Sequence, residues 1–178
     1  MPRLGANIGF LFVEMPFLDR FEAAARAGFT GVEFASPYEY PAAELRARLQ
    51  ANGLSLVLIN SPAGNRAAGE RGFACLPGRT DIFRDGVNQA LDYAASLDCK
   101  MIHVMAGVPP ADLAYDTALA LYATNLSWAA EKAKTAGVKL VIEPLNPRDA
   151  PGYLLRTQEQ GAAIVARSEE HTSELQSL

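Results

Sequence analysis

Short apolar runs alternate along the chain with longer segments whose apolar positions recur every three or four residues. The helical period is clearest where Phe83, Val87, Leu91, Ala94 and Leu97 fall on one face. Helices are predicted over residues 19–28, 42–53, 83–99 and 121–137, with a poorly bounded one over 157–166. Strands are predicted over residues 4–10, 31–34, 54–60, 100–105 and 139–143.

The later four strands are apolar on both faces, which is typical of a parallel sheet covered by other layers. Alternating strands and helices leave two architectures, an open doubly wound sheet or a barrel. No glycine-rich phosphate loop follows the first strand, as an open nucleotide-binding sheet would have. Polar residues instead close strand after strand, which favours a (β/α)₈ TIM barrel with its site on that face. They are Asn7, Glu33, Asn60, His103 and Glu143.

Composition narrows the class of protein. The 178 residues carry a formal net charge of −4, so no cationic surface for nucleic acid or anionic lipid is expected. Cys75 and Cys99 lack the spacing of a zinc site or disulfide scaffold. The apolar start is followed by Glu14 and Asp19 without a cleavage site, and no run is long enough to span a membrane. These features predict a cytoplasmic protein.

The last twelve residues differ from the rest. The run RSEEHTSELQSL has no apolar periodicity, and its first eleven residues equal the translation of a widely used sequencing adaptor. We therefore interpret residues 1–166 as a partial barrel and residues 167–178 as a non-native tail. A complete barrel of this kind needs roughly 250 residues. The expected fold is thus a TIM barrel truncated after about five βα units.

Glu143 is the strongest candidate for chemistry. A carboxylate that ends a buried strand is costly unless it is paired, protonated or bound to metal. A structural role would pair it with Arg148 or Lys139, whereas a functional role makes it a general base or metal ligand. Pro144 fixes the following turn, and Asn146 offers an amide close by.

The remaining candidates allow two interpretations each. His103 is either a hydrogen-bonded core residue or part of a site with Glu143, and Glu33 either binds substrate hydroxyls or pairs with a cation. Residues 60–79 form a long, glycine-rich and basic loop that is either a lid or a solvated surface loop. Its arginines, Arg71 among them, could bind a carboxylate.

Several stretches together resemble the hydroxypyruvate isomerases of the xylose-isomerase-like TIM-barrel superfamily. They include SPAGNRAAGERGFACLPGR in the basic loop, HVMAG, and LVIEPLNPRDAPGYLL, and the resemblance extends to about Ala166. The family commonly has Gly-Asp-Trp in the loop, where this chain has Gly64, Asn65 and Arg66. The resemblance implies that Glu143 is one of two catalytic glutamates that also bind a divalent metal, Mg²⁺ or Mn²⁺. The second glutamate and the other ligands belong to strands six to eight, which are expected to be absent.

The reaction implied by the resemblance interconverts hydroxypyruvate and tartronate semialdehyde through an enediolate, with carboxylates moving the proton. The substrate would be a small hydroxy-oxo acid, and Asn7, Glu33, Arg71, His103 and Asn146 are the candidate substrate-binding residues. A homo-oligomer is compatible with this interpretation. The isolated fragment is expected to be inactive.

Other functions, both within this superfamily and outside it, remain open. Within the superfamily, 2-oxo-tetronate isomerases and ketose 3-epimerases use similar barrels. More remote are a metal-dependent DNA-repair endonuclease, which the net charge disfavours, and a non-enzymatic binding module, since fold alone does not establish function.

Overall fold

In the computed structural model, which describes residues 4–169 and 175–177, parallel strands form one sheet in the order β1-β2-β3-β4-β5-β6. Every neighbouring pair is parallel, and each strand follows its neighbour in the chain. The strands are β1 (Gly5–Asn7), β2 (Gly31–Glu33), β3 (Ser55–Asn60), β4 (Met101–His103), β5 (Lys139–Ile142) and β6 (Leu175–Ser177). This order is that of part of a TIM barrel, so the predicted fold class is confirmed.

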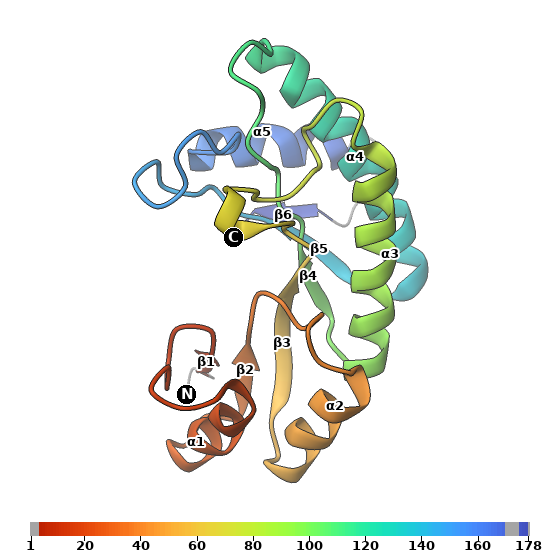
Figure 1. The fold of residues 1–178 in the computed structure, drawn as a ribbon. Coiled ribbons are helices and arrows are strands. Elements are labelled where there is room, and N and C mark those ends of the chain that lie inside the picture. Colours follow the sequence, from red (N-terminus) through yellow and green to blue (C-terminus); the bar gives the residue numbers. More distant parts are fainter. Residues whose placement is uncertain (1–3, 170–174, 178) are drawn as a thin grey trace.

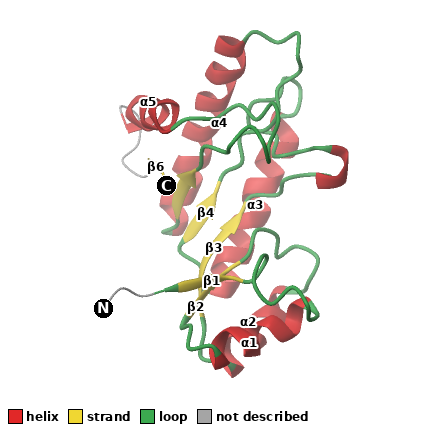
Figure 2. Ribbon diagram, turned by 90° about the vertical axis from the view of Figure 1, so that its left-hand side faces the viewer, coloured by secondary structure: helices red, strands yellow, loops and turns green. Residues whose placement is uncertain are grey.

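Helices cover the outer side of the curved sheet (Figure 1). They are α1 (Arg20–Arg26), α2 (Ala42–Ala51), α3 (Thr80–Leu97), α4 (Tyr115–Ala136) and α5 (Gln158–Glu169), with short 3₁₀ turns at Phe17–Asp19 and Arg66–Ala68. Helix α3 contacts β3 and β4, and α4 contacts β5. In Figure 2 the strands lie in front of these helices, which leaves the inner side of the sheet free to carry the site.

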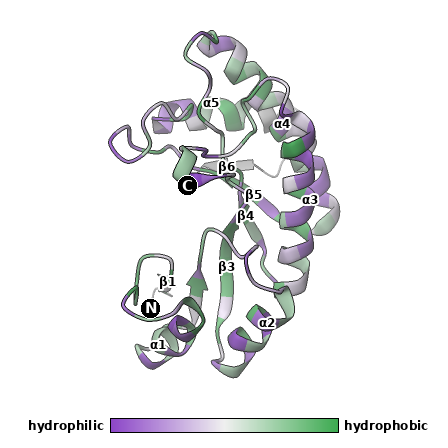
Figure 3. Ribbon diagram, in the orientation of Figure 1, coloured by the Kyte–Doolittle hydropathy of each residue, from purple (hydrophilic) through white to green (hydrophobic). Residues whose placement is uncertain are grey.

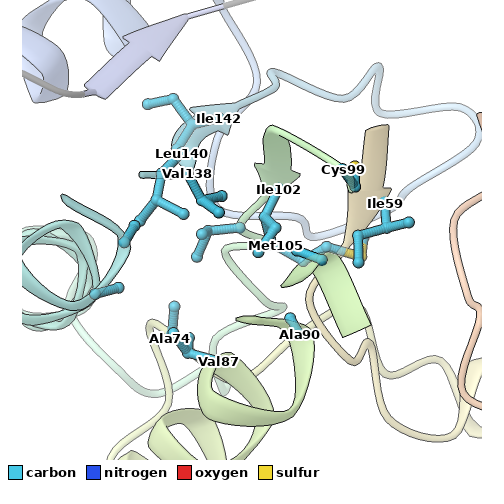
Figure 4. Packing of buried hydrophobic residues seen from close by; sticks show 14 of the residues in the cluster. Ile59, Ala74, Val87, Ala90, Cys99, Ile102, Met105, Val138, Leu140 and Ile142 are labelled. Atoms are coloured by element: carbon cyan, nitrogen blue, oxygen red, sulfur yellow. The ribbon is translucent and has the colours of Figure 1, made fainter. Parts of the chain in front are cut away.

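The main core lies between the strands and the helices. Figure 4 shows Ile102 and Leu140 of the strands facing Val87 and Ala90 of α3, and all four are buried. Strand β3 is largely hydrophobic in Figure 3, whereas α3 has both apolar and polar stretches, as expected for a helix with one buried face. Burying a side chain such as Leu140 stabilises the fold by about 1.5–3 kcal/mol.

Two helices begin earlier than their periodicity predicts. Helix α3 starts at Thr80 instead of residue 83, and α4 starts at Tyr115 instead of residue 121. The added turns are mostly exposed, so they carry few buried apolar positions that could reveal them in the sequence. Asp81 and Asp116 lie in these first turns, where an acidic side chain favours a helix start.

The described part of the predicted non-native tail, residues 167–178, continues the last helix and adds a strand to the sheet. Helix α5 continues to Glu169, and β6 pairs with β5 in the register Leu140 to Leu175. The physical reason is that β5 would otherwise present unpaired backbone groups, which any extended segment can satisfy. The non-native origin of this tail stays a prediction. Within residues 4–169 and 175–177, no helix is both long and apolar enough to cross a membrane.

Candidate active site

Polar side chains gather where the strands end. The register places Asn7 beside Glu33, and Asn60 beside His103, while Glu143 is the first residue after β5. Asn7, Glu33, Asn60, His103 and Glu143 all line one cleft of about 330 Å³. The sheet thus brings together residues that are up to 136 positions apart in the sequence, on the face where barrel sites form.

The carboxylate of Glu143 is half exposed, with 48% of its side chain accessible. The burial cost expected for it is therefore reduced. Its Oε2 atom lies 3.9 Å from Nδ1 of His103, and no described contact joins it to Arg148. Partial burial and, secondarily, the negative charge of Glu33 raise the pKa of Glu143 above its usual range. A raised pKa makes this carboxylate a stronger base once it is ionised.

His103 is buried, with 2% of its side chain exposed. Burial lowers the pKa of His103 to about 4, so the ring is neutral at pH 7 and its contact with Glu143 is not an ion pair. Its backbone oxygen accepts a hydrogen bond from Ser61 N at 2.8 Å. Among the described residues, its buried Nε2 atom has no hydrogen-bond partner. His103 is therefore a neutral group on the floor of the cleft beside Glu143.

The neutral state of His103 predicts a pH-dependent stability. The unfolded chain binds a proton near the ordinary pKa of 6.5, whereas the folded chain does so only near 4. The stability that follows from this difference is present above pH 6.5 and is lost as the pH falls towards 4. We expect the thermal midpoint, measured by circular dichroism in chelator-treated buffer, to fall over this range. The thermal midpoint of His103→Gln should fall less steeply as the pH is lowered. Equal slopes of midpoint against pH for both proteins would contradict a buried, neutral His103.

The lid loop, residues 60–79, is docked on the chain that follows β4. Phe73, Ala74 and Cys75 are buried. Cys75 N donates to Ala106 O at 2.8 Å, and Asn125 Nδ2 donates to Ala74 O at 2.8 Å. Its second half is thus not the solvated surface loop that the sequence also allowed.

Gly72 explains how closely the lid loop approaches. Its φ is +100°, and an added Cβ would lie 2.4 Å from Met105 O. Only glycine adopts this conformation at such a short distance without strain. The backbone at Gly72 therefore holds the adjacent Arg71 over the cleft.

The three arginines of the lid loop have different surroundings. Arg71 and Arg66 line the cleft. Arg79 forms an ion pair with Glu70 at 3.4 Å and lies over the ring of Phe73 at 4.8 Å. Glu70 also accepts a hydrogen bond from Asn65 N at 2.6 Å, so Arg79 and Glu70 together hold the loop. Arg71 and Arg66 are the cations available to a ligand.

Asn146 is the one predicted residue that does not line the cleft. Its Oδ1 atom accepts from the backbone of Arg148 and Asp149, and its Nδ2 atom donates to Asp149 Oδ2 at 2.6 Å. The side chain closes a turn, which brings Asp149 to the cleft wall instead. A substrate role for Asn146 stays a prediction.

Two other residues at or near the cleft are not apparent from the sequence. Phe10 lines the cleft although it is 76% exposed. Tyr153 is buried, and its hydroxyl accepts a hydrogen bond from Ala106 N at 2.8 Å. Burial is the main cause that raises the pKa of Tyr153, with smaller contributions from Cys75 and Glu143. Phe10 could have been suspected as an apolar residue in a loop, whereas Tyr153 resembles any core residue.

The described residues do not by themselves make a metal centre. Among residues 4–169 and 175–177, no three His, Cys, Asp or Glu side chains come together as a metal ion requires. Glu143 offers one carboxylate of the oxygen type that Mg²⁺ and Mn²⁺ prefer. The predicted divalent metal therefore stays a prediction, and no step of the reaction below depends on it.

Polar side chains at the carboxyl ends of consecutive parallel strands, beneath a docked loop, define the ligand-binding face of a TIM barrel. The chain belongs to the xylose isomerase-like TIM-barrel family, whose family model matches residues 21–173. The predicted resemblance is thus confirmed.

Named relatives support the same assignment. The chain is 52% identical to a 2-oxo-tetronate isomerase of Cupriavidus necator over 92% of its length, and 44% identical to a hydroxypyruvate isomerase of Escherichia coli over 93%. It spans 63% and 64%, respectively, of these two relatives. A crystal structure titled AP endonuclease, family 2, from Brucella melitensis superposes with a TM-score of 0.95 at 40% identity, over 99% of this chain and 67% of that one.

Proposed function

We propose that the whole protein is an isomerase of the aldose–ketose type that acts on a short hydroxy-oxo acid such as hydroxypyruvate. The observation that carries the proposal is the presence, in one cleft, of the Glu143 carboxylate and the lid arginines Arg71 and Arg66. A base and a cationic anchor are the two groups that proton abstraction from a hydroxy-oxo acid requires. Relatives named as isomerases of such acids support it.

The chemistry assigned to Glu143 is a proton transfer between neighbouring carbons. Its carboxylate takes the proton from C3, the carbon that bears the hydroxyl, and the electrons of the C–H bond move toward the C2 carbonyl oxygen. A proton that replaces the one taken by Glu143 is then added at C2 of the enediolate. The proton of the C3 hydroxyl passes to the oxygen on C2, so hydroxypyruvate becomes tartronate semialdehyde without net oxidation. Arg71 binds the substrate carboxylate and holds C3 near Glu143.

A second substrate is favoured by a specific observation. Three relatives at 45–52% identity are named 2-oxo-tetronate isomerases, whereas one at 44% is named a hydroxypyruvate isomerase and four at 38–42% are named putative hydroxypyruvate isomerases. The same proton transfer on 2-oxo-tetronate, a four-carbon acid, uses the same groups. We therefore include this acid among the candidate substrates.

The other expectations stay predictions. An endonuclease role is disfavoured by the net charge of −4, although one structural relative carries that title. Cytoplasmic location, self-association and the divalent metal are likewise proposals for the whole protein.

Proton NMR in D₂O tests the function. The whole protein, supplied with Mg²⁺ or Mn²⁺, should exchange the C3 protons of hydroxypyruvate for deuterium and form tartronate semialdehyde. Neither exchange nor product with hydroxypyruvate and 2-oxo-tetronate would refute the proposal.

Arg71→Ala should raise KM far more than it lowers kcat, because an anchor that binds substrate and transition state alike contributes uniform binding. Loss of a hydrogen-bonded ion contact predicts an increase of roughly 10- to 100-fold in KM. Arg84, an exposed arginine on α3, supplies the control Arg84→Ala. An unchanged KM in Arg71→Ala would show that Arg71 does not bind the substrate.

A further inference from the structure

The charged residues of the cleft come from different elements. Arg71 and Arg66 come from the lid loop, whereas Glu33 ends β2, and Glu143 and Asp149 lie in the segment after β5. Glu33 and Glu143 line the same cleft, and the charge of Glu33 contributes to the raised pKa of Glu143. Charge complementarity would place the carboxylate of an anionic substrate at the arginines and its uncharged, hydroxyl-bearing end toward Glu33.

Glu33 is held in one orientation by its neighbour on β1. Asn7 Nδ2 donates to Glu33 Oε1 at 2.8 Å, and the two residues are register partners. Among the described residues, Glu33 Oε2 has no hydrogen-bond partner. Glu33 thus presents one bound oxygen and one that can accept a hydrogen bond from a ligand.

Asn7 uses both ends of its side chain within the protein. Its Oδ1 atom accepts from Gly9 N at 3.0 Å, at the start of the loop that carries Phe10. With Nδ2 bound to Glu33, the amide orients both Glu33 and the start of this loop. A substrate role for Asn7 itself stays a prediction.

We propose that Glu33 is a specificity-determining residue that selects a four-carbon 2-oxo acid by accepting a hydrogen bond from its C4 hydroxyl, and that Asn7 is the positioning residue for Glu33. The proposal rests on the proposed isomerase function. Hydroxypyruvate has three carbons and no such hydroxyl, so it leaves the free oxygen of Glu33 without this bond. Sites built to bind a hydroxyl discriminate against the analogue that lacks it, because their polar groups are then unpaired.

The test compares kcat/KM for 2-oxo-tetronate with kcat/KM for hydroxypyruvate in the whole protein. The ratio of the two cancels any loss common to both substrates, including one transmitted through Glu143. Glu33→Ala removes the acceptor and should lower the ratio roughly 10- to 100-fold, the range for a hydrogen bond to a charged group. Glu44→Ala, at an exposed carboxylate on α2, is the matched control and should leave the ratio unchanged.

Asn7→Asp tests the positioning role. Aspartate keeps an acceptor for Gly9 N but places a second carboxylate against Glu33, so it disturbs Glu33 without removing the loop contact. The ratio should fall in the same direction as in Glu33→Ala. A residue that only stabilises the fold would lower the thermal midpoint and leave the ratio unchanged.

The possible outcomes test the roles of Glu33 and Asn7 and the isomerase function separately. An unchanged ratio in Glu33→Ala, or turnover of hydroxypyruvate alone by the wild type, overturns the role of Glu33 while the isomerase function stands. An unchanged ratio in Asn7→Asp overturns the role of Asn7. Turnover of neither substrate by the wild type refutes the proposed function itself. If Glu33→Ala does not fold, Glu33→Asp keeps the charge, shortens its reach and must lower the ratio.

Discussion

Replacing Glu143 with glutamine in the whole protein should abolish isomerisation while the fold remains intact. Glutamine keeps the size of the side chain but cannot accept the substrate proton. General-base catalysis alone contributes about 10²–10⁴-fold, and we expect kcat to fall by at least about 10³-fold. The half-exposed position of the side chain makes a large loss of stability unexpected. The measurements are turnover of hydroxypyruvate and 2-oxo-tetronate, and the thermal midpoint.

Glu131, an exposed carboxylate on α4, supplies the control for that experiment. Glu131→Gln changes the net charge equally and should retain full activity. If Glu143→Gln keeps even a tenth of the wild-type kcat, Glu143 is structural and the proposed mechanism fails.

Gly72→Ala should displace the lid loop and lower both stability and substrate affinity. The added Cβ would lie 2.4 Å from Met105 O and 2.6 Å from Met105 Cβ, so the backbone must move. Backbone strain at positive φ and overpacking each cost on the order of 1–3 kcal/mol. Arg71, a proposed substrate-binding residue, immediately precedes Gly72. We therefore expect KM to rise together with the fall in thermal midpoint.

Gly69 offers a matched control within the same loop. Its φ is +85°, close to that of Gly72, but an added Cβ would meet nothing within 4 Å. Gly69→Ala therefore carries the conformational strain without the clash. The difference between the two variants in thermal midpoint and KM measures the effect of the close contact with Met105. Equal changes in both variants would show that this contact is unimportant.

Much of the fold could be predicted from the sequence because each βα unit is specified locally. One example is the apolar stripe from Phe83 to Leu97, and another is the strand around Leu140, which is apolar on both faces. Both patterns are formed by residues that are close in the chain. The first turns of α3 and α4 were missed because exposed turns lack that signal. The pairing of β6 with β5 was missed because an open sheet edge accepts segments without a recognisable strand pattern.

The sequence by itself determined the class of fold, the position of Glu143 at the end of a core strand and the basic loop that contains Arg71. Only the tertiary structure decided which of these residues share a cleft and what state they are in. It separated Arg71 and Arg66 from Arg79, which is held by Glu70, and showed His103 to be buried and neutral. It also showed that Asn7 is hydrogen-bonded to Glu33 and Gly9, and that Asn146 closes a turn. The physical reason is that burial and hydrogen-bond partners depend on residues far apart in the chain, which local periodicity does not encode.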